Sequence, residues 1–351
     1  MTSPEASRPR RPARSLRRLA AIAALVVGAG FVGFTTTQAG AQSSGGADAQ
    51  AIAAKVNPAV VSITNTLAGG QGQAAGTGMV ITPSGEVITN NHVIQNAGSI
   101  RVRIGGTGRS HSAEVLGYNV REDIALLKVD GVSDLKTVTT DTSPSVGELV
   151  VALGNGGGRG DTAEPTTGSV TAVGEAITVG DLGGSAHRLT NLIRTNASLQ
   201  PGDSGGPLID ADAEVIGVNT AASTGGFRFG SGSRTGFAIP IKTAFSVANQ
   251  IESGQGSGDT HVGERAFLGV SIRSGAGTEI ADVQSGSPAE KAGIRQGAVI
   301  GSIGGKKVRS LDDLTSALAP YHPRDKVAVS WTDSSGRQHT ADVTLASGPP
   351  A

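Results

Sequence analysis

The stretch NASLQPGDSGGPLID (residues 196–210) places Ser204 between an aspartate and two glycines, ahead of an apolar strand. A serine nucleophile needs a base to take its proton, an acid to orient that base, and backbone N–H groups facing the oxyanion. Gly202 has no Cβ and can bring its N–H close to a reacting carbonyl, and the N–H of Ser204 can point to the same spot. We therefore predict oxyanion donors at Gly202 and Ser204. A plain glycine-rich turn is the alternative.

A histidine and an aspartate upstream of this serine are candidates for the base and the acid. His92, in GEVITNNHVI (residues 85–94), directly follows a four-residue strand pattern. Asp123, in REDIALLKVD (residues 121–130), precedes a fully apolar strand, so its half-buried carboxylate must be paired or hydrogen-bonded. The remaining histidines stand in polar or loop contexts and are predicted to be solvated, at positions 111, 187, 261, 322 and 339.

The order of these three residues along the chain strengthens the interpretation. Taken singly, each has an ordinary structural explanation, and Asp130 and Asp141 are alternatives to Asp123. Together, His92, Asp123 and Ser204 follow one of the known chain orders of a Ser-His-Asp triad. That order accompanies a fold of two β-barrels.

The strand pattern points to the same all-β fold. Glycine makes up 53 of the 351 residues, which suits a chain with many tight turns. Short β-branched runs separated by turn residues predict an antiparallel barrel pair with little helix. These runs cover residues 59–64, 78–82, 86–89, 100–104, 125–129, 148–153, 169–173, 192–195, 214–219 and 236–241.

Composition excludes several classes of function. The chain has no cysteine, so disulfides and thiolate metal sites are impossible. Without residues 1–41, it carries 23 basic and 28 acidic side chains, which argues against a nucleic-acid-binding body. The acidic stretch DADAE (residues 210–214) lacks the central glycine and distal glutamate of a calcium loop. We expect a turn there, and neither a metal nor another cofactor in the protein.

The N-terminus is typical of an export segment. RPRRPARSLRR (residues 8–18) is cationic, LAAIAALVVGAGFVGF (residues 19–34) is apolar, and AGA (residues 39–41) matches a small-residue cleavage site. Residues 1–41 are therefore a signal peptide cleaved before Gln42 or an uncleaved signal-anchor, because about 20 apolar residues suffice to cross a bilayer. Both alternatives place the rest of the protein outside the cytoplasm.

The C-terminal third is predicted to form a helix, a linker and a small domain. Residues 241–254 follow an amphipathic helical pattern, and residues 253–263 are a Gly/Ser-rich linker. Residues 264–347 mix strands with short helical patterns and predict a smaller α+β domain. Within it, Ser310 is an N-cap with Asp313 at the third helical position. The helix that follows has an apolar stripe of Leu311, Leu314 and Leu318.

Four motifs of the first domain resemble the HtrA/DegP family of serine proteases. They are GTGMVITPSGEVITNNHVI (76–94), DIALLKV (123–129), PGDSGGPLID (201–210) and GFAIPI (236–241). The resemblance implies two perpendicular six-stranded barrels of the chymotrypsin type over residues 52–252, preceded by a linker over residues 42–51.

The same resemblance implies the roles of individual residues. His92, Asp123 and Ser204 correspond to the family's catalytic triad, and the substrate strand and S1 pocket correspond to Asn219, Thr220 and Ala221. Small side chains at these positions suggest cleavage after modest aliphatic residues. Family members commonly form trimers, so we expect a homo-oligomer.

The small domain resembles a PDZ domain of the circularly permuted bacterial type. Such a domain adds a peptide strand to a sheet edge and holds a C-terminal carboxylate on backbone N–H groups. By resemblance, the carboxylate-binding loop is the FLGV segment formed by Phe267, Leu268, Gly269 and Val270.

Two functions from different classes follow. The first is an exported, ATP-independent serine endopeptidase that cleaves misfolded or signalling proteins of the cell envelope, with the PDZ domain binding exposed C-termini. The alternative is a chaperone or peptide-binding envelope protein that uses the protease domain as a scaffold. A membrane-anchored sensor is compatible with the first.

Asp203 differs from the HtrA/DegP family that the chain resembles, because most members of that family carry asparagine at this position. In trypsin-like zymogens, an aspartate here captures a newly freed N-terminus after a basic cleavage site. Around residues 42–60, only AKVNPAV offers a basic residue, Lys55, and no glycine pair follows it. We therefore predict that Asp203 is a local acid of the nucleophile loop that makes the order of that loop sensitive to pH.

Overall fold

The computed structural model describes residues 41–350, apart from 69–71, 107, 156–162, 181–185, 221–234, 257–258 and 274–276. All but the last residue of the predicted signal peptide or anchor lies outside the described residues. Within the described part of the chain, no helix is long and apolar enough to cross a membrane.

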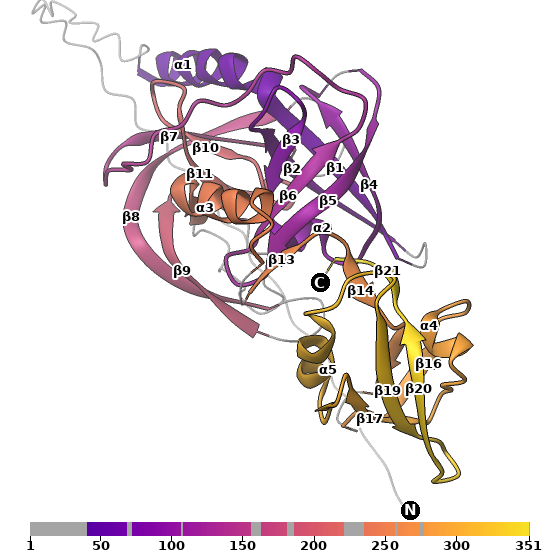
Figure 1. Cartoon of the computed structure of the whole chain (residues 1–351). Coiled ribbons are helices and arrows are strands. Elements are labelled where there is room, and N and C mark those ends of the chain that lie inside the picture. The colour runs from indigo at the N-terminus through magenta and orange to yellow at the C-terminus, as the bar shows by residue number, and fades with distance from the viewer. Residues whose placement is uncertain are drawn as a thin grey trace, which may run out of the picture. The chain divides into compact units, whose positions relative to one another are not determined.

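Residues 60–129 fold into an antiparallel barrel of six strands (Figure 1). Each strand pairs with the next in the order β4, β1, β2, β3, β6, β5. The pairing of β5 with β4 closes the ring. Alternate residues such as Val61, Ile63, Val87 and Leu127 fill its interior and are fully buried, as period-two patterning requires. The strands are β1 (Val60–Leu67), β2 (Gln73–Val80), β3 (Glu86–Thr89), β4 (Ala97–Ile104), β5 (His111–Asn119) and β6 (Ile124–Val129).

The next six strands close a second barrel, so the prediction of two six-stranded barrels is confirmed. Its ring order is β7, β8, β9, β12, β11 and β10. The interior holds Ile193, Leu208, Ile216 and Ala238. The strands are β7 (Leu149–Gly154), β8 (Glu164–Gly180), β9 (Ala186–Thr195), β10 (Pro207–Ile209), β11 (Val215–Thr220) and β12 (Gly236–Pro240).

A third apolar core joins the two barrels. It combines Met79 and Leu126 of the first barrel with Leu153 and Val218 of the second, and all four are fully buried. Strands β2 and β6 therefore share one core with β7 and β11. Hydrogen bonds at this junction position the candidate active site.

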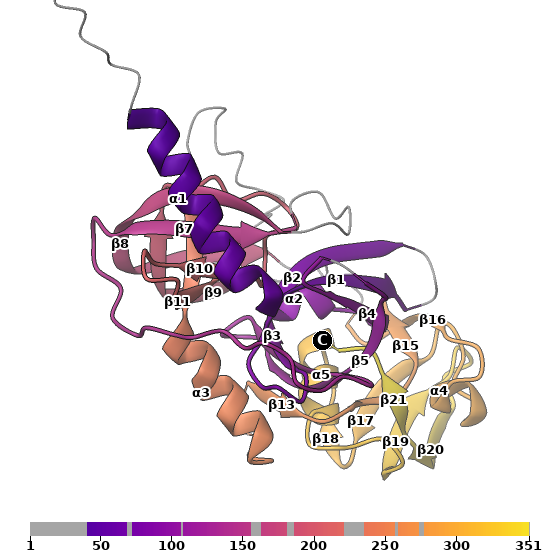
Figure 2. The ribbon, with the colours of Figure 1, turned by 90° about the horizontal axis from the view of Figure 1, so that it is seen from above.

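The linker predicted over residues 42–51 is wrong, because helix α1 (Ala41–Val56) occupies these residues (Figure 2). Ala49, Ala53 and Val56 are buried in the core between the barrels. Their spacing of four and three residues places them on one helical face. The glycines and serines at its start hid this pattern in the sequence.

The helix predicted over residues 241–254 is confirmed as α3 (Ile241–Glu252).

The linker predicted over residues 253–263 is wrong in its second half, because β13 (Thr260–Val262) pairs with β5. Asn119 Nδ2 donates to Thr260 Oγ1 at 2.7 Å across this pairing. His261, expected to be solvated, is only partly exposed, and its ring centroid lies 5.2 Å from that of Tyr118.

The C-terminal residues form the smaller α+β domain that the sequence predicts, around a core of its own. The capping prediction is confirmed, because Ser310 Oγ accepts from the Asp313 N–H and Asp313 Oδ2 accepts from the Arg309 N–H. The predicted apolar stripe is wrong at Leu311, which is half exposed. The elements are β14 (Arg265–Phe267), β15 (Val270–Ile272), β16 (Ile280–Val283), α4 (Pro288–Lys291), β17 (Val299–Ile303), β18 (Lys306–Lys307), α5 (Leu311–Leu318), β19 (Lys326–Thr332), β20 (Gln338–Thr344) and β21 (Ala346–Gly348).

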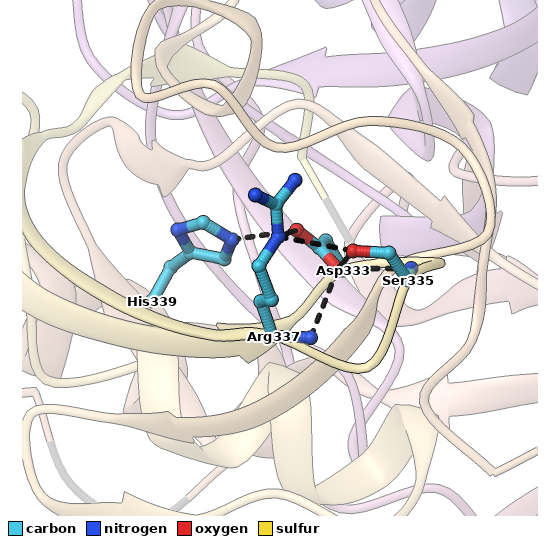
Figure 3. A network of polar contacts seen from close by, with 4 residues as sticks. All are labelled: Asp333, Ser335, Arg337 and His339. Carbon is cyan, nitrogen blue, oxygen red and sulfur yellow. Dashed lines mark hydrogen bonds and ion pairs between the residues drawn. The ribbon is translucent and has the colours of Figure 1, made fainter.

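A polar network fixes the turn between β19 and β20 (Figure 3). The Asp333 carboxylate accepts hydrogen bonds from Ser335, from the Arg337 N–H and from the His339 ring. The hydrogen bonds from the Ser335 and His339 side chains hold the pKa of Asp333 well below its usual range. The His339 ring also stacks on Trp331, with ring centroids 5.3 Å apart. The network therefore stabilises the hairpin.

Candidate active site

His92 and Asp123 meet at the edge of the first barrel. His92 lies in the short helix α2 (Asn91–Ile94), directly after β3, and Asp123 immediately precedes β6. The ring Nδ1 of His92 lies 2.8 Å from Asp123 Oδ2, and the backbone N–H of His92 donates to Asp123 Oδ1 at 3.0 Å. Because β3 and β6 are paired neighbours, residues 31 positions apart come into contact. The two hydrogen bonds use both carboxylate oxygens.

The surrounding backbone and side chains hold Asp123 in place. Asp123 is 4% exposed and has a left-handed backbone, with φ of 53°. Its carbonyl accepts from the Asn91 N–H at 3.2 Å and from Asn90 Nδ2 at 2.9 Å. Thr220 Oγ1, at the end of β11, lies 3.4 Å from Asp123 Oδ2. The acid therefore has hydrogen-bonding partners from both barrels.

The pKa of His92 lies above its ordinary value of 6.5. Burial is the largest effect and lowers the pKa, but the charge of Asp123 and its hydrogen bond together outweigh burial. The His92 side chain keeps 38% of its surface exposed, so solvent moderates both effects. Because the folded-state pKa is raised, the ion pair stabilises the fold below pH 6.5, and this contribution disappears as pH rises through the raised pKa.

The raised pKa predicts the acid limb of the activity profile. His92 must be neutral to accept a proton, so kcat/KM for a peptide substrate is expected to fall on the acid side with a midpoint above 6.5. Initial rates from pH 5 to 9 at fixed ionic strength measure this midpoint. A midpoint below 6.5 would show that Asp123 does not stabilise the protonated ring of His92 enough to outweigh burial.

The nucleophile loop begins with a tight turn from Gln200 to Asp203. The Asp203 N–H donates to the Gln200 carbonyl at 3.0 Å, and Pro201 and Gly202 are the central residues. Gly202 has φ of 103°, which fits the third position of a type II turn and strongly favours glycine. Among the described residues, the Gly202 N–H has no hydrogen-bond acceptor. This N–H is thus available for an oxyanion.

Ser204 follows this turn and is anchored at the junction of the barrels. It is 4% exposed, and its carbonyl accepts from the Thr77 N–H in β2 at 2.8 Å. The Gly205 N–H donates to the Asn219 carbonyl at 2.8 Å, next to the Thr220 that approaches Asp123. These contacts bring Ser204 to the same junction as His92 and Asp123.

Asp203 is buried beneath the nucleophile loop. It is 7% exposed, and its Oδ2 accepts from the Gln200 N–H at 2.8 Å. Burial raises the pKa of Asp203, the hydrogen bond from Gln200 opposes this rise, and the negative charge of Glu164 adds to it. The protonated, neutral carboxyl of Asp203 therefore stabilises the folded loop at low pH. This stabilisation is lost as pH rises through the raised pKa and the carboxyl becomes charged.

The substitution Asp203→Asn tests this pH sensitivity. The amide oxygen can still accept from the Gln200 N–H, and the neutral side chain avoids the cost of burying a charge. The ratio of variant to wild-type kcat/KM is therefore expected to rise from pH 4 to pH 8, because only the wild-type side chain becomes charged over this range. A ratio that stays constant over this range would remove Asp203 as a pH-sensitive group.

The residues predicted for the substrate pocket lie at the end of β11. The side chain of Asn219 is fully buried and donates to the carbonyls of Leu153 and Pro207, so it braces the second barrel. Thr220 is 2% exposed and approaches Asp123. Ala221 lies outside the described residues. The role of this segment in binding substrate stays a prediction.

The structure also shows where the alternative acids Asp130 and Asp141 and the acidic stretch of residues 210–214 lie. Of the alternatives to Asp123, Asp130 is exposed, and Asp141 Oδ1 accepts from the Ser143 N–H in a turn. Asp210 Oδ1 accepts from the N–H groups of Asp212 and Glu214, so the DADAE segment forms the expected turn between strands.

Sequence reasoning missed Thr77 and Asn90. Thr77 contacts the nucleophile loop, and Asn90 supports the acid. Both lie in strand or strand-end patterns with no local feature that distinguishes them from ordinary polar residues. Only the pairing of distant segments reveals their contacts.

The predicted carboxylate-binding loop of the small domain joins β14 to β15. Its Leu268 carbonyl accepts from the Ala289 N–H at 2.8 Å, and its Gly269 carbonyl accepts from the Gln284 N–H at 3.0 Å. Gly269 has φ of 86°, and a Cβ there would lie 2.2 Å from the Cβ of Ser287. Within the described part of the chain, the N–H groups of Leu268 and Gly269 have no acceptor.

Two separate parts of the chain match known protein families. A trypsin-like peptidase domain model matches residues 76–218, and a PDZ domain model matches residues 279–330. Serine protease PepD of Mycobacterium tuberculosis is 32% identical over 84% of this chain and 65% of that protein. The periplasmic pH-dependent serine endoprotease DegQ of Escherichia coli is 34% identical over 78% of this chain and 59% of that protein.

A solved serine endoprotease from Yersinia pestis is 27% identical, with a TM-score of 0.47, over 85% of this chain and 97% of that chain. The chain spans between about half and two thirds of the length of the curated relatives it matches, from 50% to 65%.

Proposed function

We propose that this chain, which belongs to the HtrA/DegP family of trypsin-like serine proteases with a PDZ domain, is a serine endopeptidase of the cell envelope. The observation that carries the proposal is the pairing of His92 with both oxygens of the buried Asp123, at the junction that also anchors Ser204. Matching relatives named as periplasmic serine endoproteases support the location outside the cytoplasm.

In the proposed reaction, Ser204 Oγ attacks the scissile carbonyl and His92 takes its proton. Asp123 accepts from Nδ1–H of His92 and so leaves Nε2 as the basic nitrogen. The N–H groups of Gly202 and Ser204 stabilise the negative charge that develops on the carbonyl oxygen. His92 then returns the proton to the leaving amine, and water repeats the sequence to release the acyl group.

Covalent labelling tests the proposal against the alternative of a chaperone-like scaffold. An activated serine reacts with a fluorophosphonate probe, so the wild-type chain is expected to be labelled and Ser204→Ala is not. Ser198→Ala, a neighbouring serine outside the turn, serves as the matched control and should label as wild type does. Absence of Ser204-dependent labelling, with and without an added C-terminal peptide, would favour the scaffold.

We also propose that the PDZ domain binds exposed C-termini. Two observations support this: the acceptor-free N–H groups of Leu268 and Gly269, and strand β15, which pairs only with β16 among the described residues. An extended peptide can add to the other edge of β15 while its carboxylate meets these N–H groups. Calorimetry should show that a peptide with a free C-terminus binds about tenfold or more tightly than its C-terminal amide. Equal affinities would contradict carboxylate recognition.

The finer expectations complete the proposal. Substrates are misfolded or signalling proteins of the envelope, cleaved after modest aliphatic residues, and the active form is a homotrimer. A peptide library varied at the residue before the scissile bond tests the first point, and a preference for Arg or Phe would contradict it. Light scattering on the purified chain measures the oligomer.

A further inference from the structure

Thr77 contacts the nucleophile loop at two points, although it belongs to the other barrel. Its backbone N–H donates to the Ser204 carbonyl at 2.8 Å. Its hydroxyl Oγ1 donates to the Gly202 carbonyl at 2.7 Å. Thr77 is fully buried and Gly202 is partly buried, so water has little access to either contact. Thr77 therefore holds the loop on both sides of Asp203.

The same hydroxyl also accepts a hydrogen bond. The Asn155 N–H, at the end of β7, donates to Thr77 Oγ1 at 2.9 Å. A hydroxyl that accepts from one backbone group must direct its own hydrogen elsewhere, and here that direction is the Gly202 carbonyl. The Asn155 N–H thus helps to orient the hydroxyl toward the turn.

The residues around Thr77 leave it little room to move. Its carbonyl accepts from Thr89 Oγ1 at 2.6 Å. Cβ atoms added at Gly205 and Gly206 would lie 2.0 Å from the Thr77 carbonyl oxygen and 3.0 Å from its Cγ2. The glycines that follow Ser204 are packed directly against this residue.

We propose that Thr77 is a positioning residue for the oxyanion-binding turn. Its hydroxyl fixes the Gly202 carbonyl and hence the peptide plane between Gly202 and Asp203. With that plane and the Gln200–Asp203 hydrogen bond both fixed, the conformation of the turn is set, and with it the direction of the Gly202 N–H, which has no acceptor among the described residues. Thr77 touches no substrate atom in this proposal and acts through Gly202. The inference rests on the proposed serine-protease function.

Thr77→Val tests the proposal, because valine keeps the shape and removes the hydroxyl. A displacement of about 1 Å at a catalytic group can cost about 100-fold in rate. We expect kcat to fall roughly 10- to 100-fold, with KM within about threefold of wild type. A peptide boronate, which forms a tetrahedral adduct, should bind more weakly by a similar factor, whereas a non-reactive peptide inhibitor should not.

Thr195→Val is the matched control. Thr195 is also fully buried, donates to the Ser169 carbonyl at 2.9 Å and accepts from the Ala197 N–H at 3.1 Å. The Thr195→Val variant therefore loses one donated and one accepted hydrogen bond, as Thr77→Val does, but neither bond involves residues 200–206. Thr77→Ser should restore kcat, and Thr77→Ala, which leaves room for a bridging water, should lie between Ser and Val.

The outcomes separate this inference from the proposed function. If the wild-type chain reacts with fluorophosphonate and Thr77→Val keeps wild-type kcat and boronate affinity, the positioning role is overturned. The same holds if Thr195→Val loses as much kcat as Thr77→Val, since the effect would then be general destabilisation. If the wild-type chain itself does not react, the proposed function fails, and this inference fails with it.

Discussion

Replacement of Asp123 by asparagine is expected to lower kcat about 10⁴-fold while KM changes little. The carboxylate accepts two hydrogen bonds from His92, one from the ring and one from the backbone N–H. Asparagine has a single acceptor oxygen, so its NH₂ group must face one of these two donors. If the NH₂ faces the ring, it favours the tautomer that carries its proton on Nε2, and Nε2 then cannot accept the Ser204 proton.

Steady-state kinetics with a peptide substrate measure this loss, and the pH profile adds a second readout. Without the negative charge, the imidazolium loses its partner, so the midpoint of the acid limb should move to lower pH. Asp130→Asn and Asp141→Asn are the controls and should retain wild-type kcat. Activity of Asp123→Asn within tenfold of wild type, or an equal loss in Asp141→Asn, would contradict the assignment of Asp123.

Gly205→Ala is expected to lower the free energy of unfolding by about 3 kcal/mol or more and to abolish activity. A Cβ at this position would lie 2.0 Å from the Thr77 carbonyl oxygen and 2.3 Å from Thr89 Oγ1. Gly205 also has φ of 85°, a conformation that alanine adopts only with strain. The backbone of β2 cannot retreat without breaking the contacts that position the nucleophile loop.

Gly147→Ala separates the clash from the backbone strain. Gly147 has φ of 90°, but a Cβ added there would have no neighbouring atom within 4 Å. Alanine there should cost only about 1 to 2 kcal/mol, from backbone strain alone. Urea unfolding followed by far-UV circular dichroism, together with peptide hydrolysis, measures both variants. Equal costs for the two substitutions would show that the close contact with Thr77 relaxes easily.

The sequence by itself determined the strands, the barrel count and the candidate triad. Alternating β-branched residues determine which side chains face a core, and this information is local. The N-cap at Ser310 and helix α3 were predictable for the same reason. Helix α1 was missed because it begins with serines and glycines, and strand β13 because it directly follows a Gly/Ser-rich stretch. Both elements form by packing or pairing with distant parts of the fold.

Only the tertiary structure decided which residues meet at the junction of the barrels. It paired Asp123, rather than Asp130 or Asp141, with His92, because β3 and β6 are neighbours in one barrel. It also turned the Asn219 side chain into the interior and placed Thr77 against Gly202, 125 positions away. Contacts between such distant residues depend on how the strands pair and how the barrels pack, and no short stretch of sequence contains that information.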